Sequence, residues 1–274
     1  MGRLSIVAEV LALRHPRHLA ENPAWLWANL LALDAPVIAL IWQDYLARHF
    51  ALPLHPAGRA VLGLTVWAIY LADHLIDVRQ VDVRQVDVRR AEFAGERARH
   101  SFCRRHLRGF RAVLLLILSA DFLVACSWVR PVVFEYGAIV ASGVVVYFVA
   151  FPLRRFGSAT WKKPFAAFLF TAGIFLVAWT DAAHPWTMLS RAAAAFFALC
   201  LANLLLIESW EQGRELKYGW IAMAILCLSC MRWFWPASVA AAALAILSFG
   251  SGRISTEARC ALADAVLLSP LLFS

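Results

Sequence analysis

Residues 187–208 read TMLSRAAAAFFALCLANLLLIE, a run of apolar side chains with only a few polar interruptions. A helix of about 20 such residues is long enough to cross a hydrocarbon layer of roughly 30 Å. Similar runs recur along the chain, of which 62% is hydrophobic and only 16% charged. A soluble domain could not cover so much apolar side chain, because its surface must be wetted. The sequence therefore predicts an all-α integral membrane protein embedded in a lipid bilayer.

The apolar runs predict about nine transmembrane helices around a central cavity, in a single domain formed by residues 1–274. We expect these helices near residues 27–46, 58–77, 111–128, 133–152, 163–181, 187–208, 217–235, 237–250 and 259–273. The longest connection is an Arg-rich loop over residues 78–110. A period-five repeat, DVRQV-DVRQV-DVRR, runs from Asp77 to Arg90. Because a period of five fits neither a heptad nor a known solenoid unit, we interpret it as a tolerated expansion of the loop.

Basic residues are divided unevenly between the two sides that nine spans create. One side holds only five of the 26 Lys and Arg residues, namely Arg48, Arg59, Arg130, Arg191 and Arg232. The others lie at the N-terminus and in the loops after even-numbered spans. The positive-inside rule places that side, and with it the N-terminus, in the cytoplasm. We therefore interpret the net charge of +8 as topological, not as a nucleic-acid site, and expect a location such as the inner membrane of a bacterium.

The second predicted span ends in YLADHLID, which places Asp73 and Asp77 four residues apart on one helix face. Two carboxylates there repel each other, and their oxygens suit a hard cation such as Mg²⁺, which one or two carboxylates and a substrate phosphate usually hold. The simpler alternative places both acids in interfacial water, paired with loop arginines. His74, between them, is expected to be an ordinary interfacial histidine and not a base.

The sixth predicted span leads into a second acidic face, in the stretch ANLLLIESWEQGRELKYG. Glu208, Glu211 and Glu215 follow a 3-then-4 spacing, and Asn203 lies one to two turns earlier inside the apolar run. Ionisable groups in membrane spans are candidates for functional sites. Two acidic faces on the same membrane side predict two halves of one site, which would hold a diphosphate through bridging Mg²⁺.

The end of the second span resembles the first Asp-rich motif of the UbiA superfamily of membrane prenyltransferases. That motif reads roughly NDxxDxxxD. The matching stretch, IYLADHLID, keeps the last two acids as Asp73 and Asp77. It has Ile69 and Tyr70 where the family has Asn and Asp. Ile69 in place of that Asn removes a polar contact that the family has near its metal. The RxxRP segment that usually follows this motif is absent.

The sixth span is similar to the second motif of the same superfamily, DxxxD followed by Lys and Gly. Glu211 and Glu215 stand at the acid positions, and Lys217 and Gly219 follow. Asn203 occupies the position of an Asn that often precedes this motif. The stretch FPLRR, residues 151–155, resembles the family's YPxxKR. Nine spans and a cytoplasmic N-terminus also match the family.

The resemblance implies a Mg²⁺-dependent enzyme that ionises an isoprenyl diphosphate. It implies that the catalytic and metal-binding residues are Asp73, Asp77, Glu211 and Glu215. It implies that the substrate is bound by Asn203, Glu208, Arg79, Arg154, Lys162 and Lys217, although the arginines and Lys162 also serve topology.

Three functions remain open at this point. In a prenyltransferase, a lipophilic acceptor attacks the allylic carbocation that departing diphosphate leaves behind. In a terpene cyclase of the same superfamily, a double bond of the same chain attacks it, and the degenerate first motif keeps this alternative. A non-enzymatic transporter would use intramembrane acids for ion or proton coupling. Asp34, expected in the middle of the first span, would face the bundle interior as a structural group or in the cavity.

Overall fold

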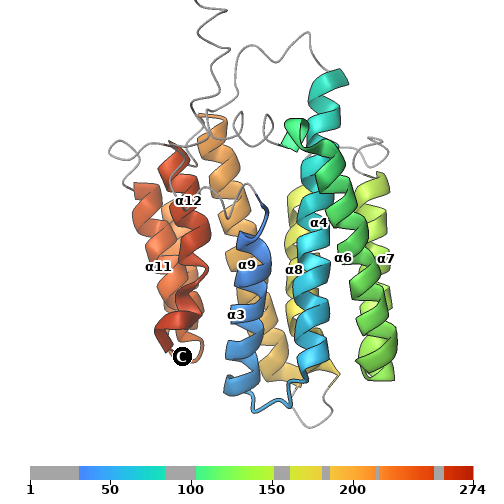
Figure 1. Ribbon diagram of the computed structural model, residues 1–274. Coiled ribbons are helices and arrows are strands. Elements are labelled where there is room, and N and C mark those ends of the chain that lie inside the picture. The colour runs from blue at the N-terminus through green and yellow to red at the C-terminus, as the bar shows by residue number, and fades with distance from the viewer. Residues whose placement is uncertain are drawn as a thin grey trace, which may run out of the picture.

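The computed structural model describes residues 31–83, 103–150, 161–180, 186–213, 216, 218–249 and 256–273, with the backbone alone for residues 77–83 and 257. Within these ranges the protein is helical and has no strand, which confirms the all-α prediction. The helices are α3 (Asp34–His49), α4 (Pro56–Val83), α6 (Leu107–Trp128), α7 (Pro131–Ala150), α8 (Lys162–Trp179), α9 (Trp186–Glu211), α10 (Gly219–Cys230), α11 (Trp235–Phe249) and α12 (Thr256–Val266), followed by the 3₁₀ helix η4 (Ser269–Phe273). They lie alongside one another as a bundle (Figure 1).

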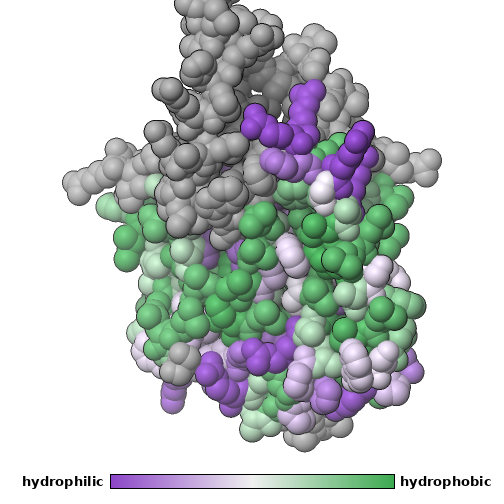
Figure 2. Space-filling view, in the orientation of Figure 1, coloured by the Kyte–Doolittle hydropathy of each residue, from purple (hydrophilic) through white to green (hydrophobic). Residues whose placement is uncertain are grey.

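Five of the helices, α4, α6, α7, α8 and α9, are long and apolar enough to cross a membrane. The outer helices turn large apolar side chains outward: Leu116 on α6 is 69% exposed and Ile139 on α7 is 67% exposed. Figure 2 shows a broad apolar band between polar patches at the two ends of the bundle. Soluble proteins rarely expose apolar patches of this kind, so these helices indicate an integral membrane protein. The remaining described helices are shorter, and the count of nine spans stays a prediction.

The predicted start of the 78–110 loop is wrong, because α4 does not end with the apolar run at Asp77. It continues to Val83, into the second copy of the DVRQV repeat. The repeat contains neither Gly nor Pro, so nothing in it interrupts the backbone hydrogen bonds of the helix. α4 therefore extends past its apolar segment by more than one turn.

The prediction that Asp34 lies in the middle of a span is also wrong, because Asp34 is the first residue of α3. The chain reaches it through Ala32, whose φ of 54° is left-handed and cannot continue an α-helix. Trp67 of α4 donates a hydrogen bond of 3.0 Å to the Leu31 carbonyl. This bond joins the segment just before α3 to α4. A carboxylate is favoured at the start of α3 by the positive end of the helix dipole.

Aromatic side chains form the centre of the core. The indole ring of Trp42 on α3 lies 4.6 Å from the Phe196 ring on α9 and 5.6 Å from the Phe234 ring before α11. Its Nε1 donates a hydrogen bond of 2.8 Å to the carbonyl of Leu267, just after α12. All three aromatic side chains are fully buried. One tryptophan therefore joins the first described helix to α9 and to the last part of the described chain.

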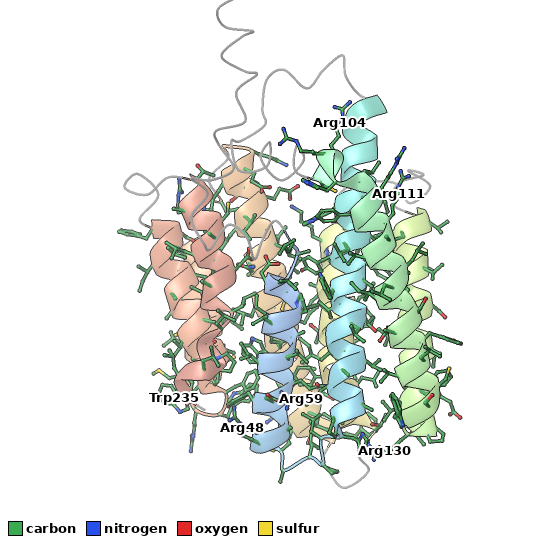
Figure 3. The ribbon with its side chains drawn as sticks, viewed as in Figure 1. Arg48, Arg59, Arg104, Arg111, Arg130 and Trp235 are labelled. Atoms are coloured by element: carbon green, nitrogen blue, oxygen red, sulfur yellow. The ribbon has the colours of Figure 1, made fainter. Side chains whose placement is uncertain are left out.

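The labelled arginines of Figure 3 divide between the two ends of the bundle. Arg104 and Arg111 lie at the end where α4 finishes, whereas Arg48, Arg59 and Arg130 lie at the opposite end. This is the division that alternating spans predict for these five residues. Which end faces the cytoplasm stays a prediction.

Replacing Trp42 with Ala should destabilise the protein by roughly 3–5 kcal/mol, because the change leaves a large cavity and removes a buried hydrogen bond. The measurement is the unfolding transition of the purified protein in detergent. Trp128→Ala is the matched control, since the Trp128 side chain is 66% exposed on the outer surface. Equal destabilisation by the two substitutions would contradict the central packing role of Trp42.

Candidate functional site

The acidic ends of α4 and α9 meet at the first turn of α8. The Nζ atom of Lys162, where α8 begins, lies 3.7 Å from Oδ1 of Asp73 on α4. The Nζ atom of the next residue, Lys163, lies 2.5 Å from Oε2 of Glu208 on α9. We call these four residues the acid–lysine rim. The two predicted acidic segments therefore lie at the same end of the bundle, on either side of the start of α8.

The four charged side chains of the acid–lysine rim are partly exposed to solvent. They are between 24% and 42% exposed. Ion pairs with this exposure stabilise a fold by only about 0–1 kcal/mol each. The lysines also stand at the positive end of the α8 dipole, where cations are disfavoured unless anions compensate. The rim is thus a place where a bound anion or cation could replace the present partners at little free-energy cost.

A second polar group lies further inside the bundle. Asn203 of α9 is 3% exposed, and its Nδ2 donates a hydrogen bond of 3.0 Å to Oδ1 of Asp264 on α12. Its Oδ1 is buried without a hydrogen-bond partner. Tyr70 of α4 packs against the core, and the carboxylates of Asp34, Asp264 and Asp73 all act electrostatically on its hydroxyl. We call Asp34, Tyr70, Asn203 and Asp264 the inner polar cluster.

The inner polar cluster lies about one to one and a half helical turns inward from the acid–lysine rim. Asn203 precedes Glu208 by five residues, which is about 7.5 Å along α9. Tyr70 precedes Asp73 by three residues, which is about 4.5 Å along α4. Both helices run toward the rim, so the two offsets point in the same direction.

The last helix contributes charged residues that the sequence prediction missed. Besides Asp264, α12 provides Arg259, whose guanidinium carbon lies 5.5 Å from the centre of the Trp210 ring on α9. Glu211, Asp264 and Arg259 all act electrostatically on the thiol of Cys260. The sequence did carry one signal for Asp264, namely an acid inside the predicted ninth span. Lys163 was also missed, and its pairing with Glu208 is a tertiary contact that no local pattern indicates.

The residues predicted from the sequence are distributed as follows. Asp73, Glu208 and Lys162 belong to the acid–lysine rim, and Asn203 belongs to the inner polar cluster. Glu211 is the last residue of α9 and is exposed, whereas His74 is buried and only 7% exposed. Only the backbone is described for Asp77 and Arg79, and outside the described residues lie Arg154, Glu215 and Lys217.

Among the side chains that the structure describes, no three His, Cys, Asp or Glu residues are grouped to hold a metal ion. Mg²⁺ usually keeps several waters and is bound by one or two carboxylates together with substrate phosphates. The rim offers Asp73 and Glu208 on two different helices, with a lysine beside each. This donor set fits a Mg²⁺–phosphate group better than a metal held by protein ligands alone.

Cysteine pairs should reveal the convergence of the two acidic segments. Lys162→Cys with Asp73→Cys, and Lys163→Cys with Glu208→Cys, should each be joined by a short thiol crosslinker in a background without the native cysteines. Mass spectrometry of the digested protein would identify the linked peptides. The control pair is Lys162→Cys with Arg59→Cys, because Arg59 lies at the opposite end of the bundle (Figure 3). Crosslinking of the control alone would contradict the arrangement of the rim.

Comparisons of the chain with protein families, with curated proteins and with solved structures found no match. The function is therefore inferred from the acid–lysine rim, the inner polar cluster and the motifs of the chain itself.

Proposed function

We propose that the protein is a Mg²⁺-dependent, membrane-embedded prenyltransferase. It would ionise an isoprenyl diphosphate at the acid–lysine rim and transfer the prenyl group to a lipophilic acceptor. The pairing of Lys162 with Asp73 and of Lys163 with Glu208 is the observation that carries this proposal. It brings acids of two distant segments, which resemble the two UbiA motifs, beside two cations at one end of an apolar bundle.

The charges of the rim suit a diphosphate. Lys162 and Lys163 would bind its oxygens at the N-terminus of α8, where the helix dipole also favours an anion. Asp73 and Glu208, released from the lysines, would hold Mg²⁺ together with the predicted ligands Asp77, Glu211 and Glu215. The bound Mg²⁺ would neutralise negative charge on the departing diphosphate.

The interior of the bundle suits the prenyl chain. Inward from Glu208 on α9, Leu206 and Leu199 are buried, and Phe196 packs in the aromatic core. An allylic carbocation formed at the rim would enter these apolar surroundings. Exclusion of water is needed there, because water would quench the cation before the acceptor attacks.

One observation favours a terpene cyclase as the second candidate. Tyr70, which stands where the family motif has an acid, belongs to the inner polar cluster and not to the rim. Aromatic rings stabilise cations over their faces, and a cyclase must guide its carbocation through several such positions. The acids at the rim would ionise the substrate in the same way in both enzymes.

The test is an incubation of the purified protein with Mg²⁺ and prenyl diphosphates of several chain lengths. Diphosphate release that requires an added aromatic acceptor, with a prenylated product, is expected. Release without an acceptor, together with a hydrocarbon product, identifies the cyclase. No release in either arm contradicts an enzyme of this class and favours the transporter, whose intramembrane acids would couple ions or protons. Sealed inner-membrane vesicles of both orientations would then show whether the site faces the cytoplasm, as we propose.

Asp73→Asn should lower the rate of diphosphate release by about 10–100-fold or more, because it removes a charge that would hold Mg²⁺. Asp44→Asn is the matched control. Asp44 forms a 2.7 Å ion pair with Arg59, with similar side-chain exposure, at the opposite end of the bundle. We expect wild-type turnover from this control. A comparable loss in both variants would indicate a general effect on the fold, and a fully active Asp73→Asn protein would refute the assignment of the rim.

A further inference from the structure

The proposed ionisation step uses the acid–lysine rim and leaves the inner polar cluster without a role. Four helices, α3, α4, α9 and α12, bring this cluster together inside an apolar bundle. Polar groups in such surroundings are unfavourable unless they are satisfied by one another or by a ligand. The proposed ionisation step does not account for these polar groups.

One atom of the cluster points to a ligand. The Oδ1 atom of Asn203 is buried without a hydrogen-bond partner, while the Nδ2 atom of the same amide is committed to Asp264. The carboxylates of Asp34, Asp73 and Asp264 come from three different helices, and all three act on the Tyr70 hydroxyl. Carboxylates that lie near one another in apolar surroundings favour nearby positive charge and the uptake of protons.

The depth of the cluster matches the substrate of the proposed reaction. The cluster lies about 4.5–7.5 Å inward from the rim along α4 and α9. A prenyl chain whose diphosphate is bound at the rim would place its first isoprene units at this level. The carbon atoms that become cationic after ionisation would thus lie close to the cluster.

We propose that Asp264 is the proton acceptor that completes the reaction, an inference that rests on the proposed function. The C1–O bond breaks and diphosphate leaves with the electron pair. The π electrons of the acceptor, or of the same chain in a cyclase, then form a new C–C bond to the cation. This attack creates a second carbocation, and the electron pair of an adjacent C–H bond restores the double bond. The proton from that C–H bond passes to the carboxylate of Asp264.

The neighbours of Asp264 suit this role. The hydrogen bond from Asn203 holds the Asp264 carboxylate in place. Asn203 is in this respect a positioning residue. A carboxylate has about four lone-pair sites on its two oxygens, so it can accept a proton while it accepts hydrogen bonds. Asp34 and the ring of Tyr70 add negative potential and a π-face where the second carbocation forms.

The experiment compares wild-type protein with Asp264→Asn, in the presence of Mg²⁺ and the prenyl diphosphate and acceptor that the wild type uses. The substitution is nearly isosteric, and its amide oxygen can still accept the hydrogen bond from Asn203. The readout is the amount of C–C-bonded product formed per diphosphate released, with both measured in the same reaction. We expect this ratio to fall by about 100-fold or more. Without a proton acceptor the second carbocation breaks its new C–C bond and expels the prenyl cation again, and water captures that cation as prenyl alcohol.

Asp121→Asn is the matched control. Asp121 on α6 accepts a hydrogen bond of 2.7 Å from Thr65 on α4, so it is also an acid held inside the bundle, but it does not belong to the inner polar cluster. Its variant should keep the wild-type product ratio. If Asp264→Asn does not assemble, Asp264→Glu replaces it, since this variant keeps the charge and displaces the carboxylate. A shift toward alcohol or another double-bond isomer is then expected.

An unchanged product distribution in the assembled Asp264 variant overturns the assignment of Asp264 and leaves the proposed function intact. The same holds if Asp121→Asn shifts the products equally, because the effect would then not be particular to the cluster. Absence of diphosphate release from the wild-type protein would instead overturn the proposed function, and the role of Asp264 with it.

Discussion

Charged side chains in an apolar bundle need partners of opposite charge, and in this protein those partners lie on different helices. Lys162 and Lys163 are neighbours in sequence, yet they pair with acids on α4 and α9, which are more than a hundred residues apart. The carboxylates offset the unfavourable placement of two lysines at the positive end of α8, and the lysines in turn compensate the charge of the acids. Because all four side chains are partly exposed, each pair adds only about 0–1 kcal/mol. The same contacts that satisfy this constraint also fix the place where the two acidic segments meet.

The helical fold follows from the apolar runs, but the helix ends do not. Each of the helices named above, from α3 to α12, lies over one of the predicted runs. α4 nevertheless passes the last apolar residue, because helix formation needs no apolar side chain once a turn is established. α3 begins later than its apolar run indicates, because Ala32 adopts a left-handed conformation. Alanine rarely adopts this conformation, so the sequence does not indicate it. Hydropathy measures preference for lipid, whereas a helix end depends on backbone geometry and on tertiary contacts such as the one from Trp67 to Leu31.

The acids of the candidate site could be predicted from the sequence, but the residues that pair with them could not. The spacing of acids after spans two and six indicated Asp73 and Glu208, and the alternation of sides placed them together. The lysines that pair with them are chosen by packing, which a single sequence does not encode locally. Asp264 differs from the lysines, because an acid inside an apolar stretch can be recognised from the sequence as a candidate functional residue. Tyr70 was seen only as a departure from a family motif, although its position one turn from Asp73 puts it among the carboxylates.

The extension of α4 into the DVRQV repeat has a geometrical consequence. Five residues advance an α-helix by about 7.5 Å and change its rotational phase by about 140°. Gain or loss of one copy within α4 would therefore move the exit point of the chain along a screw path, while Asp73, upstream of the repeat, would keep its position. A change in the number of repeats can thus alter where, and in which direction, the following connection leaves α4. The proposed chemistry at Asp73, one turn before the repeat, would be unaffected.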